Sequence, residues 1–111
     1  MTNVAFTRSP IPTVLVLVTV VAKSETRSEL ERTLAAVVAD ARALRGCRRY
    51  DWYRSVDDSN GLFICAEFES DEAFTAYRSG PEVARIGREI LPLLERRPAF
   101  THVRATVFEE G

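Results

Sequence analysis

The residues with the most obvious chemical potential lie together in the segment CRRYDWYR, residues 47–54. Its alternating pattern predicts a β-strand, which places Tyr50, Trp52 and Arg54 on one face. The two rings could form an aromatic wall for a flat ligand, and Arg54 could hold a phenolate or enolate oxygen by a charge-assisted hydrogen bond. Core packing of the rings and a salt bridge from Arg54 to a nearby carboxylate are the alternatives, and the sequence leaves them open.

Further candidates follow in the helical segments after residue 70. Phe74 and Tyr77 are three residues apart and share a helix face. Tyr77 could remove a proton from a substrate, and Arg88 could stabilise the resulting anion. An unperturbed phenol is, however, a poor base near pH 7. Gly87 interrupts an apolar helical stripe, where its missing side chain would either leave room for a ligand or permit close contact between helix and sheet. Simple packing of Phe74 and Tyr77 on the sheet is the alternative.

Metal-dependent and histidine-dependent chemistry have little support. His102 is the single histidine, no Ser-His or Cys-His motif accompanies it, and it is interpreted as structural or as part of a dimer interface. Cys47 and Cys65 are well separated and the acidic residues are scattered, so no metal site is predicted. The two cysteines are expected to be free thiols in a reducing cytoplasm.

The composition fits a single soluble domain. The chain has 111 residues, 46% of them hydrophobic, and a formal net charge of -1. This near-neutral charge gives no general attraction to nucleic acid or to an anionic membrane surface. The longest apolar run, VLVLVTVVA, is under half the roughly 20 residues that a membrane-spanning helix needs. The expected partners are therefore a small molecule or another protein, with no nucleic acid and no membrane.

The N-terminal half contains an arm, a strand and a helix. Residues 1–12 hold two prolines and are predicted to form a flexible arm before a domain at 13–109. Val14 to Ala22 predict a strand covered on both faces. Thr26 and Glu29 predict a capping box at the start of a helix of about 18 residues, and Gly46 its stop.

The second half begins with a predicted antiparallel hairpin, residues 47–68, around the turn DDSNG. Ser70 is the expected cap of a short helix that ends at Gly80. Pro81 would start a further helix whose last turn Pro92 loosens, and residues 100–108 alternate as a closing strand.

This order of elements predicts an α+β fold with a four-stranded antiparallel sheet and helices on one face. The other face carries apolar side chains, which would meet water unless a second copy of the sheet covers them. A homodimer through the sheet faces is therefore expected.

The runs GCRRYDWYRSVDD, LFICAEFES and DEAFTAYRSGPEVA, in this order of elements, resemble the antibiotic biosynthesis monooxygenase family, over about residues 13–109. The resemblance implies a ferredoxin-like subunit, a dimeric α+β barrel, and a pocket between each subunit's sheet and helices. Many members oxidise quinols, anthrones or similar electron-rich aromatics with oxygen and no bound cofactor. One branch binds and degrades haem.

The resemblance also assigns positions. The family's usual Trp at the end of the third strand corresponds to Phe68, and a frequent His nine residues later to Tyr77. Family Asn, His and Tyr positions correspond to Ile64, Arg54 and Phe74. Taken together with the residue chemistry above, the catalytic candidates are Arg54, Tyr77 and Arg88, and the candidate substrate contacts are Tyr50, Trp52, Ile64, Phe68, Phe74 and Gly87.

These inferences lead to a cofactor-independent oxygenase-like enzyme for a polycyclic aromatic, quinol or polyketide-type intermediate of specialised metabolism. A non-oxidative cyclase or isomerase in the same pocket is one alternative, and a non-catalytic ligand-binding accessory dimer is another. Haem binding through Tyr77 is a further alternative, since tyrosine can ligate ferric haem.

Overall fold

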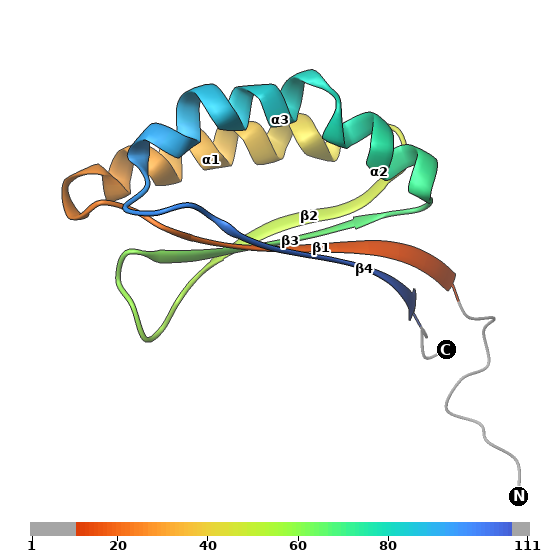
Figure 1. Cartoon of the computed structure of the whole chain (residues 1–111), viewed down its shortest axis with the longest axis horizontal. Coiled ribbons are helices and arrows are strands. Elements are labelled where there is room, and N and C mark those ends of the chain that lie inside the picture. The colour runs from red at the N-terminus through yellow and green to blue at the C-terminus, as the bar shows by residue number, and fades with distance from the viewer. Residues whose placement is uncertain (1–10, 108–111) are drawn as a thin grey trace, which may run out of the picture.

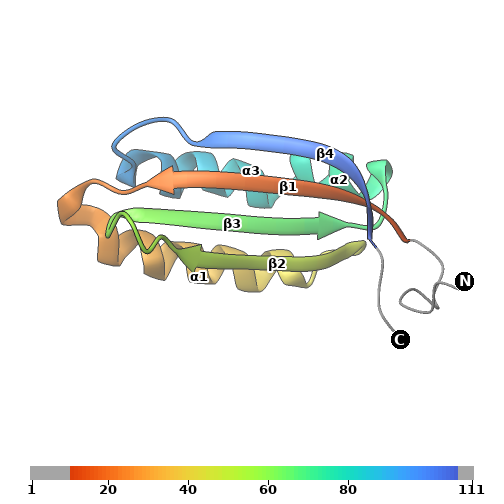
Figure 2. The same ribbon diagram turned by 90° about the horizontal axis from the view of Figure 1, so that it is seen from below.

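β1, Ile11–Val21, is the apolar strand at the centre of the sheet in this computed structural model, which describes residues 11–107. It pairs antiparallel with β3 (Gly61–Phe68) on one side and with β4 (Ala99–Val107) on the other. β2 (Cys47–Arg54) pairs with β3, which gives the order β2-β3-β1-β4 (Figure 2). The predicted hairpin and four-stranded antiparallel sheet are confirmed.

All the helices lie on one face of the sheet (Figure 1). They are α1 (Arg27–Arg42), α2 (Asp71–Arg78) and α3 (Pro81–Arg85), with a 3-10 turn, η1 (Ser24–Thr26), before α1. α3 continues through a π-helical turn, η2 (Ile86–Ile90), into a 3-10 turn, η3 (Leu91–Leu93). The ferredoxin-like α+β fold is therefore confirmed, and its core lies between the helices and alternate residues of the strands, such as Val14, Val16, Val18 and Val20 of β1.

β1 begins earlier than predicted. Ile11 and Pro12 pair with Val107 and Thr106 of β4, so these two residues belong to the sheet and not to an arm. The rest of the predicted arm, residues 1–10, and the end of the predicted domain, residues 108–109, lie outside the described residues.

The predicted capping box at Thr26 is wrong. Its hydroxyl makes no cap hydrogen bond to α1 and donates instead to the carbonyl oxygen of Leu93, 2.7 Å away. This bond ties the start of α1 to η3 at the end of the helical segment formed by residues 71–93. α1 is also slightly shorter than predicted, at 16 residues.

Gly46 sets how α1, β2 and α2 meet. Its φ of +82° is left-handed, and a Cβ at this position would lie 2.5 Å from the Cβ of Ala73 on α2. A larger residue would be strained twice, by its backbone and by the neighbouring helix. α1 ends at Arg42 with Ala43 as its C-cap, so the predicted helix stop at Gly46 is wrong, and Gly46 instead turns the chain into β2.

The sheet face opposite the helices carries a mixed surface. Leu15, Leu17, Phe63 and Cys65 are half-buried there beside an ionic network. In that network Arg49 donates to Asp51 at 2.8 Å, to Glu67 at 3.3 Å and to the Tyr53 hydroxyl at 3.0 Å. Glu67 is therefore paired with Arg49, whereas Arg104 of β4 bonds Asp71 on the helical side.

Candidate functional site

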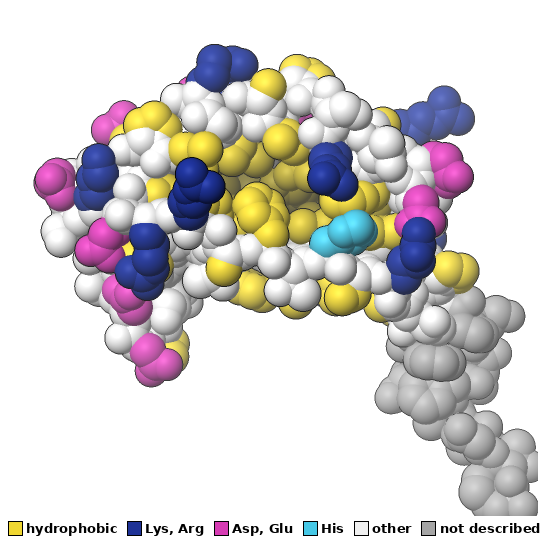
Figure 3. Space-filling model, viewed as in Figure 1, with side chains coloured by type: hydrophobic (Ala, Val, Ile, Leu, Met, Phe, Trp, Pro, Cys, Tyr) yellow, Lys and Arg dark blue, Asp and Glu magenta, His cyan; other side chains and the backbone are white. Residues whose placement is uncertain are grey.

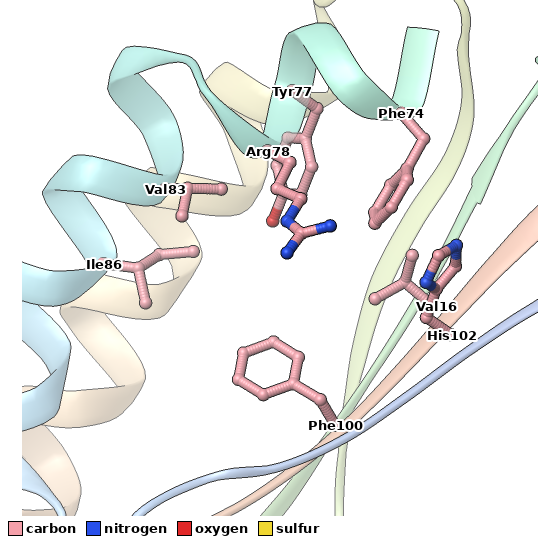
Figure 4. A pocket seen from close by; sticks show the side chains of 8 residues that line it. All are labelled: Val16, Phe74, Tyr77, Arg78, Val83, Ile86, Phe100 and His102. Atoms are coloured by element: carbon pink, nitrogen blue, oxygen red, sulfur yellow. The ribbon is translucent and has the colours of Figure 1, made fainter. Parts of the chain in front are cut away.

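A cavity of about 360 Å³ lies between β4 and the helical segment α2–α3. Figure 3 shows it as a hollow with hydrophobic side chains on its floor and the histidine at its edge. Its lining residues come from β1, α2, α3, η2 and β4: Val16, Phe74, Tyr77, Arg78, Val83, Ile86, Phe100 and His102 (Figure 4). A smaller space of about 30 Å³ shares Tyr77, Ile86 and Phe100 with it and extends toward Tyr50 and Ile64.

α2 supplies three of these side chains from a single face. Ser70 caps the helix by accepting a hydrogen bond from the Ala73 amide at 3.0 Å, as predicted. Phe74, Tyr77 and Arg78 then follow at spacings of three and four residues, which aligns them along the same side. Figure 4 shows all three directed toward the space above Phe100.

The helical segment that runs from α3 through η2 to η3 (residues 81–93) is interrupted, and this interruption leaves space between the segment and the sheet. Pro92 has no amide proton for the carbonyl four residues earlier, and the Leu91 amide bonds the Ile86 carbonyl in a π turn. Val83 and Ile86 line the cavity along this segment. The predicted loosening of the last helical turn by Pro92 is confirmed. The wide π turn before it lies above the part of the core that side chains do not fill, which is the cavity.

β4 forms the wall opposite the helices. Phe100 pairs with Val18 and His102 with Val16, so both side chains lie on the helix-covered face. β4 is an edge strand, and Phe100 is still 66% exposed. The His102 ring lies 4.4 Å from the ring of Phe74, measured between centroids. The cavity therefore opens along the β4 edge.

The inner wall is a cluster of aromatic rings around two hydroxyls. The oxygens of Tyr50 and Tyr77 are 2.7 Å apart and share one hydrogen bond. The Tyr77 ring lies 4.8 Å from Phe68 and 5.9 Å from Tyr50 between centroids. Tyr50 is 2% exposed and Phe68 is fully buried, so the cluster is fixed by the core.

The two phenols are donors and not bases. Burial, reinforced by the nearby Tyr50 hydroxyl, holds the pKa of Tyr77 far above its ordinary value. Burial also raises the pKa of Tyr50, against the opposing effect of its hydrogen bond to Tyr77. Both groups stay protonated near neutral pH, so Tyr77 is a poor acceptor for a proton. The Tyr77 hydroxyl can donate to a ligand oxygen in the arrangement in which Tyr50 is the donor of their shared hydrogen bond.

The remaining polar groups of the lining are Arg78 and His102. No carboxylate is among the lining residues of the described chain. Within residues 11–107, no group of three or more His, Cys, Asp or Glu side chains could hold a metal ion. The cavity therefore combines apolar walls with one hydroxyl donor, one imidazole and one guanidinium.

Five of the predicted site residues meet around this cavity. Phe74 and Tyr77 line it, Tyr50 and Ile64 line its smaller extension, and Phe68 supports Tyr77 from the core. The four other predicted residues, Trp52, Arg54, Gly87 and Arg88, are absent from the lining of both spaces.

Arg54 and Trp52 form a separate arrangement beside α1. Arg54 binds Glu31 through two nitrogens at 2.6 and 3.1 Å, and its guanidinium carbon lies 5.6 Å from the centre of the Trp52 ring. Trp52 is half-buried and packs against the core. Gly87 and Arg88 are exposed, and a Cβ at Gly87 would meet nothing within 4 Å, so close contact between helix and sheet does not explain this glycine.

Sequence reasoning missed six lining residues: Val16 of β1, Arg78 of α2, Val83 of α3, Ile86 of η2, and Phe100 and His102 of β4. Two signals were available for them. The alternation of β4 places Phe100 and His102 on one face, and Arg78 lies four residues after Phe74 on α2. The alternation of β4 does not show which of its faces is turned to the helices, because that depends on how β4 pairs with β1.

The fold and the cavity together define a ferredoxin-like subunit that can enclose a small, largely apolar molecule. Residues 13–89 match the family model described as antibiotic biosynthesis monooxygenase. Rv0793 of Mycobacterium tuberculosis, whose name carries a provisional monooxygenase assignment, is 32% identical over 79 residues, which cover 71% of this chain and 77% of that protein. The chain belongs to the antibiotic biosynthesis monooxygenase family.

Solved structures agree with this assignment. The Rv0793 structure matches with a TM-score of 0.78 at 30% identity, covering 87% of this chain and 97% of that one. PA3566 from Pseudomonas aeruginosa matches with a TM-score of 0.74 at 24% identity, covering 88% and 95% of the two chains. SO0527 from Shewanella oneidensis matches at 0.78 and 18% identity, covering 86% and 92%. The last two likenesses support the fold alone.

Tyr77 does not fit the role of a haem ligand. Ferric haem takes tyrosine as its phenolate, whereas burial raises the pKa of Tyr77 and its hydroxyl is bonded to Tyr50. No step is assigned to haem on this basis.

No helix within residues 11–107 is long and apolar enough to cross a membrane.

Proposed function

We propose that this protein oxidises an electron-rich polycyclic aromatic of the anthrone or quinol type with molecular oxygen and no bound cofactor, as a step of specialised metabolism. The observation that carries the proposal is the apolar cavity with a buried hydroxyl donor on one wall and an imidazole on the other. Family membership supports the reaction type.

The residues can divide the work of such a reaction. The imidazole of His102 is the lining group that could take a proton from an acidic ring carbon. Tyr77 would donate a hydrogen bond to the oxygen on which the negative charge collects. For an anthrone the overall change is a CH₂ group and O₂ converted to a ketone and water, so the carbanion supplies the electrons that reduce oxygen.

Incubation of anthrone under ¹⁸O₂, with product mass and oxygen consumption followed, tests this function. We expect one labelled oxygen in the quinone, and a loss of at least tenfold in rate for His102→Gln. The Arg32→Gln variant, which changes an exposed position on α1, serves as the control. Absence of turnover, or equal product formation without oxygen, would contradict the proposal.

A non-oxidative cyclase or isomerase is the second candidate. The observation that favours it is the placement of an imidazole and a protonated phenol on the same cavity, which is sufficient for moving a proton through an enolate. Turnover of a polyketide-type ketone that proceeds at the same rate without oxygen would select this candidate.

The proposal includes a homodimer through the open sheet faces. The half-buried Leu15, Leu17 and Phe63 on that face would gain cover from a second copy. Light scattering is expected to give the mass of two chains for the wild type and of one chain for Leu17→Glu. A monomeric wild type at micromolar concentration would contradict it.

A further inference from the structure

Arg78, the arginine that lines the cavity, differs from Arg85 and Arg104 in its ion pairs. Arg85 on α3 binds Asp40 at 2.7 Å and Glu89 at 3.1 Å, and Arg104 on β4 binds Asp71 at 3.1 Å. Arg78, the last residue of α2, makes no ion pair with a described residue. Its guanidinium is turned toward the space between Phe74 and Phe100 (Figure 4).

No acidic side chain lies on the cavity wall beside this guanidinium within the described residues. Asp71, on the same helix, is held by Arg104. In Figure 3, Lys or Arg side chains flank the hollow, whereas acidic side chains lie toward the two ends of the molecule. A charged group that enters the opening therefore meets a cation first.

We propose that the ligand of this cavity is a flat aromatic acid, with its rings among the apolar walls and its carboxylate at the opening against Arg78. A guanidinium matches a carboxylate through two parallel N–H donors, and apolar walls behind the ion pair weaken competition from water. The inner wall offers the opposite chemistry, a neutral hydroxyl on Tyr77, so it suits a ketone or phenol oxygen at the other end of the ligand.

This inference refines the substrate class of the proposed function and uses the same cavity. Binding is measured without turnover, so the two can fail separately. If neutral anthrones are oxidised and a carboxylate does not increase the affinity of the ligand, only the inference fails. If aromatic acids bind through Arg78 and no substrate is oxidised, only the proposed reaction fails.

Equilibrium binding of two matched probes, anthraquinone-2-carboxylate and anthraquinone-2-carboxamide, tests the inference. By calorimetry at pH 7.5 and 50 mM salt, we expect the carboxylate to bind at least tenfold more tightly to the wild type. Arg78→Gln should bring the ratio to below threefold while the affinity for the amide stays unchanged. Arg32→Gln, with the same loss of charge at an exposed position on α1, should keep the tenfold ratio.

Arg78 is exposed, and circular dichroism is expected to show the same fold for its variant. Equal affinity of the wild type for the two probes would overturn the inference. A carboxylate preference that survives Arg78→Gln, or that disappears equally in Arg32→Gln, would also overturn it, since the preference would then come from net charge or from another site.

Discussion

The two sides of the helix-covered sheet face differ in how completely they are filled. On the β2 side, α1 is continuous and its apolar stripe is entirely buried: Leu30, Leu34, Val37, Val38 and Ala41. On the β4 side, the helical segment is broken at Gly80 and again at η2, and a cavity remains beneath it. Tyr50 on β2 is 2% exposed, whereas Phe100 on β4 is 66% exposed. An interrupted helix, more than any special set of polar residues, creates the site.

The largest expected effect contrasts a buried residue on the β2 side with an exposed residue on the β4 side. Leu34→Ala removes a fully buried side chain under α1 and should lower the free energy of unfolding by about 2–5 kcal/mol. Phe100→Ala, at the exposed rim, should cost under about 1 kcal/mol while weakening ligand binding. Urea denaturation and probe titration of both variants measure these changes, and similar losses of stability would contradict the difference between the two sides.

Sequence patterns were sufficient for the closed side and insufficient for the open one. The apolar stripe of α1 and the alternation of β2 follow from periodicity, and both predictions are confirmed. The cavity depends on the phase of β4 against β1 and on a π turn, which no local pattern encodes. For this reason the sequence pattern predicts a site at Trp52 and Arg54, whereas it assigns Phe100 only to the closing strand and His102 to a structural or dimer-interface role.

The pair of tyrosine hydroxyls lies where the two sides meet. Tyr77→Phe leaves the buried Tyr50 hydroxyl without its partner and should cost about 1–3 kcal/mol of unfolding free energy. The double variant Tyr50→Phe with Tyr77→Phe should be less destabilised than the sum of the single variants, because no orphaned hydroxyl remains. A strictly additive double-mutant cycle would show that the two groups do not interact.

The same pair predicts a loss of stability in alkali. Both pKa values are raised in the folded state, so their contribution is complete below the unfolded pKa of about 10 and is lost as the pH rises above it. Each group adds a slope of up to about 1.4 kcal/mol per pH unit. Denaturation midpoints from pH 9 to 11 should fall more steeply for the wild type than for the double Phe variant; parallel slopes would contradict this.

The smallest effect is expected at the ion pair on the closed side. Arg54→Gln removes the contact to Glu31, but the guanidinium is exposed and its charge is screened by solvent. The denaturation midpoint should change little at neutral pH and less still at 0.5 M salt. A shift comparable with that of Leu34→Ala would mean that the β2 side depends on this pair and not on the packing of α1.

The location of the ligand is the central claim, and nuclear magnetic resonance tests it most directly. Uniformly ¹⁵N-labelled protein is titrated with anthraquinone-2-carboxamide, which does not depend on the charge at Arg78. We predict the largest amide shifts at Tyr77, Val83, Ile86, Phe100 and His102, which border the cavity. Shifts concentrated at Trp52, Arg54 and α1, with the β4 side unchanged, would contradict the account.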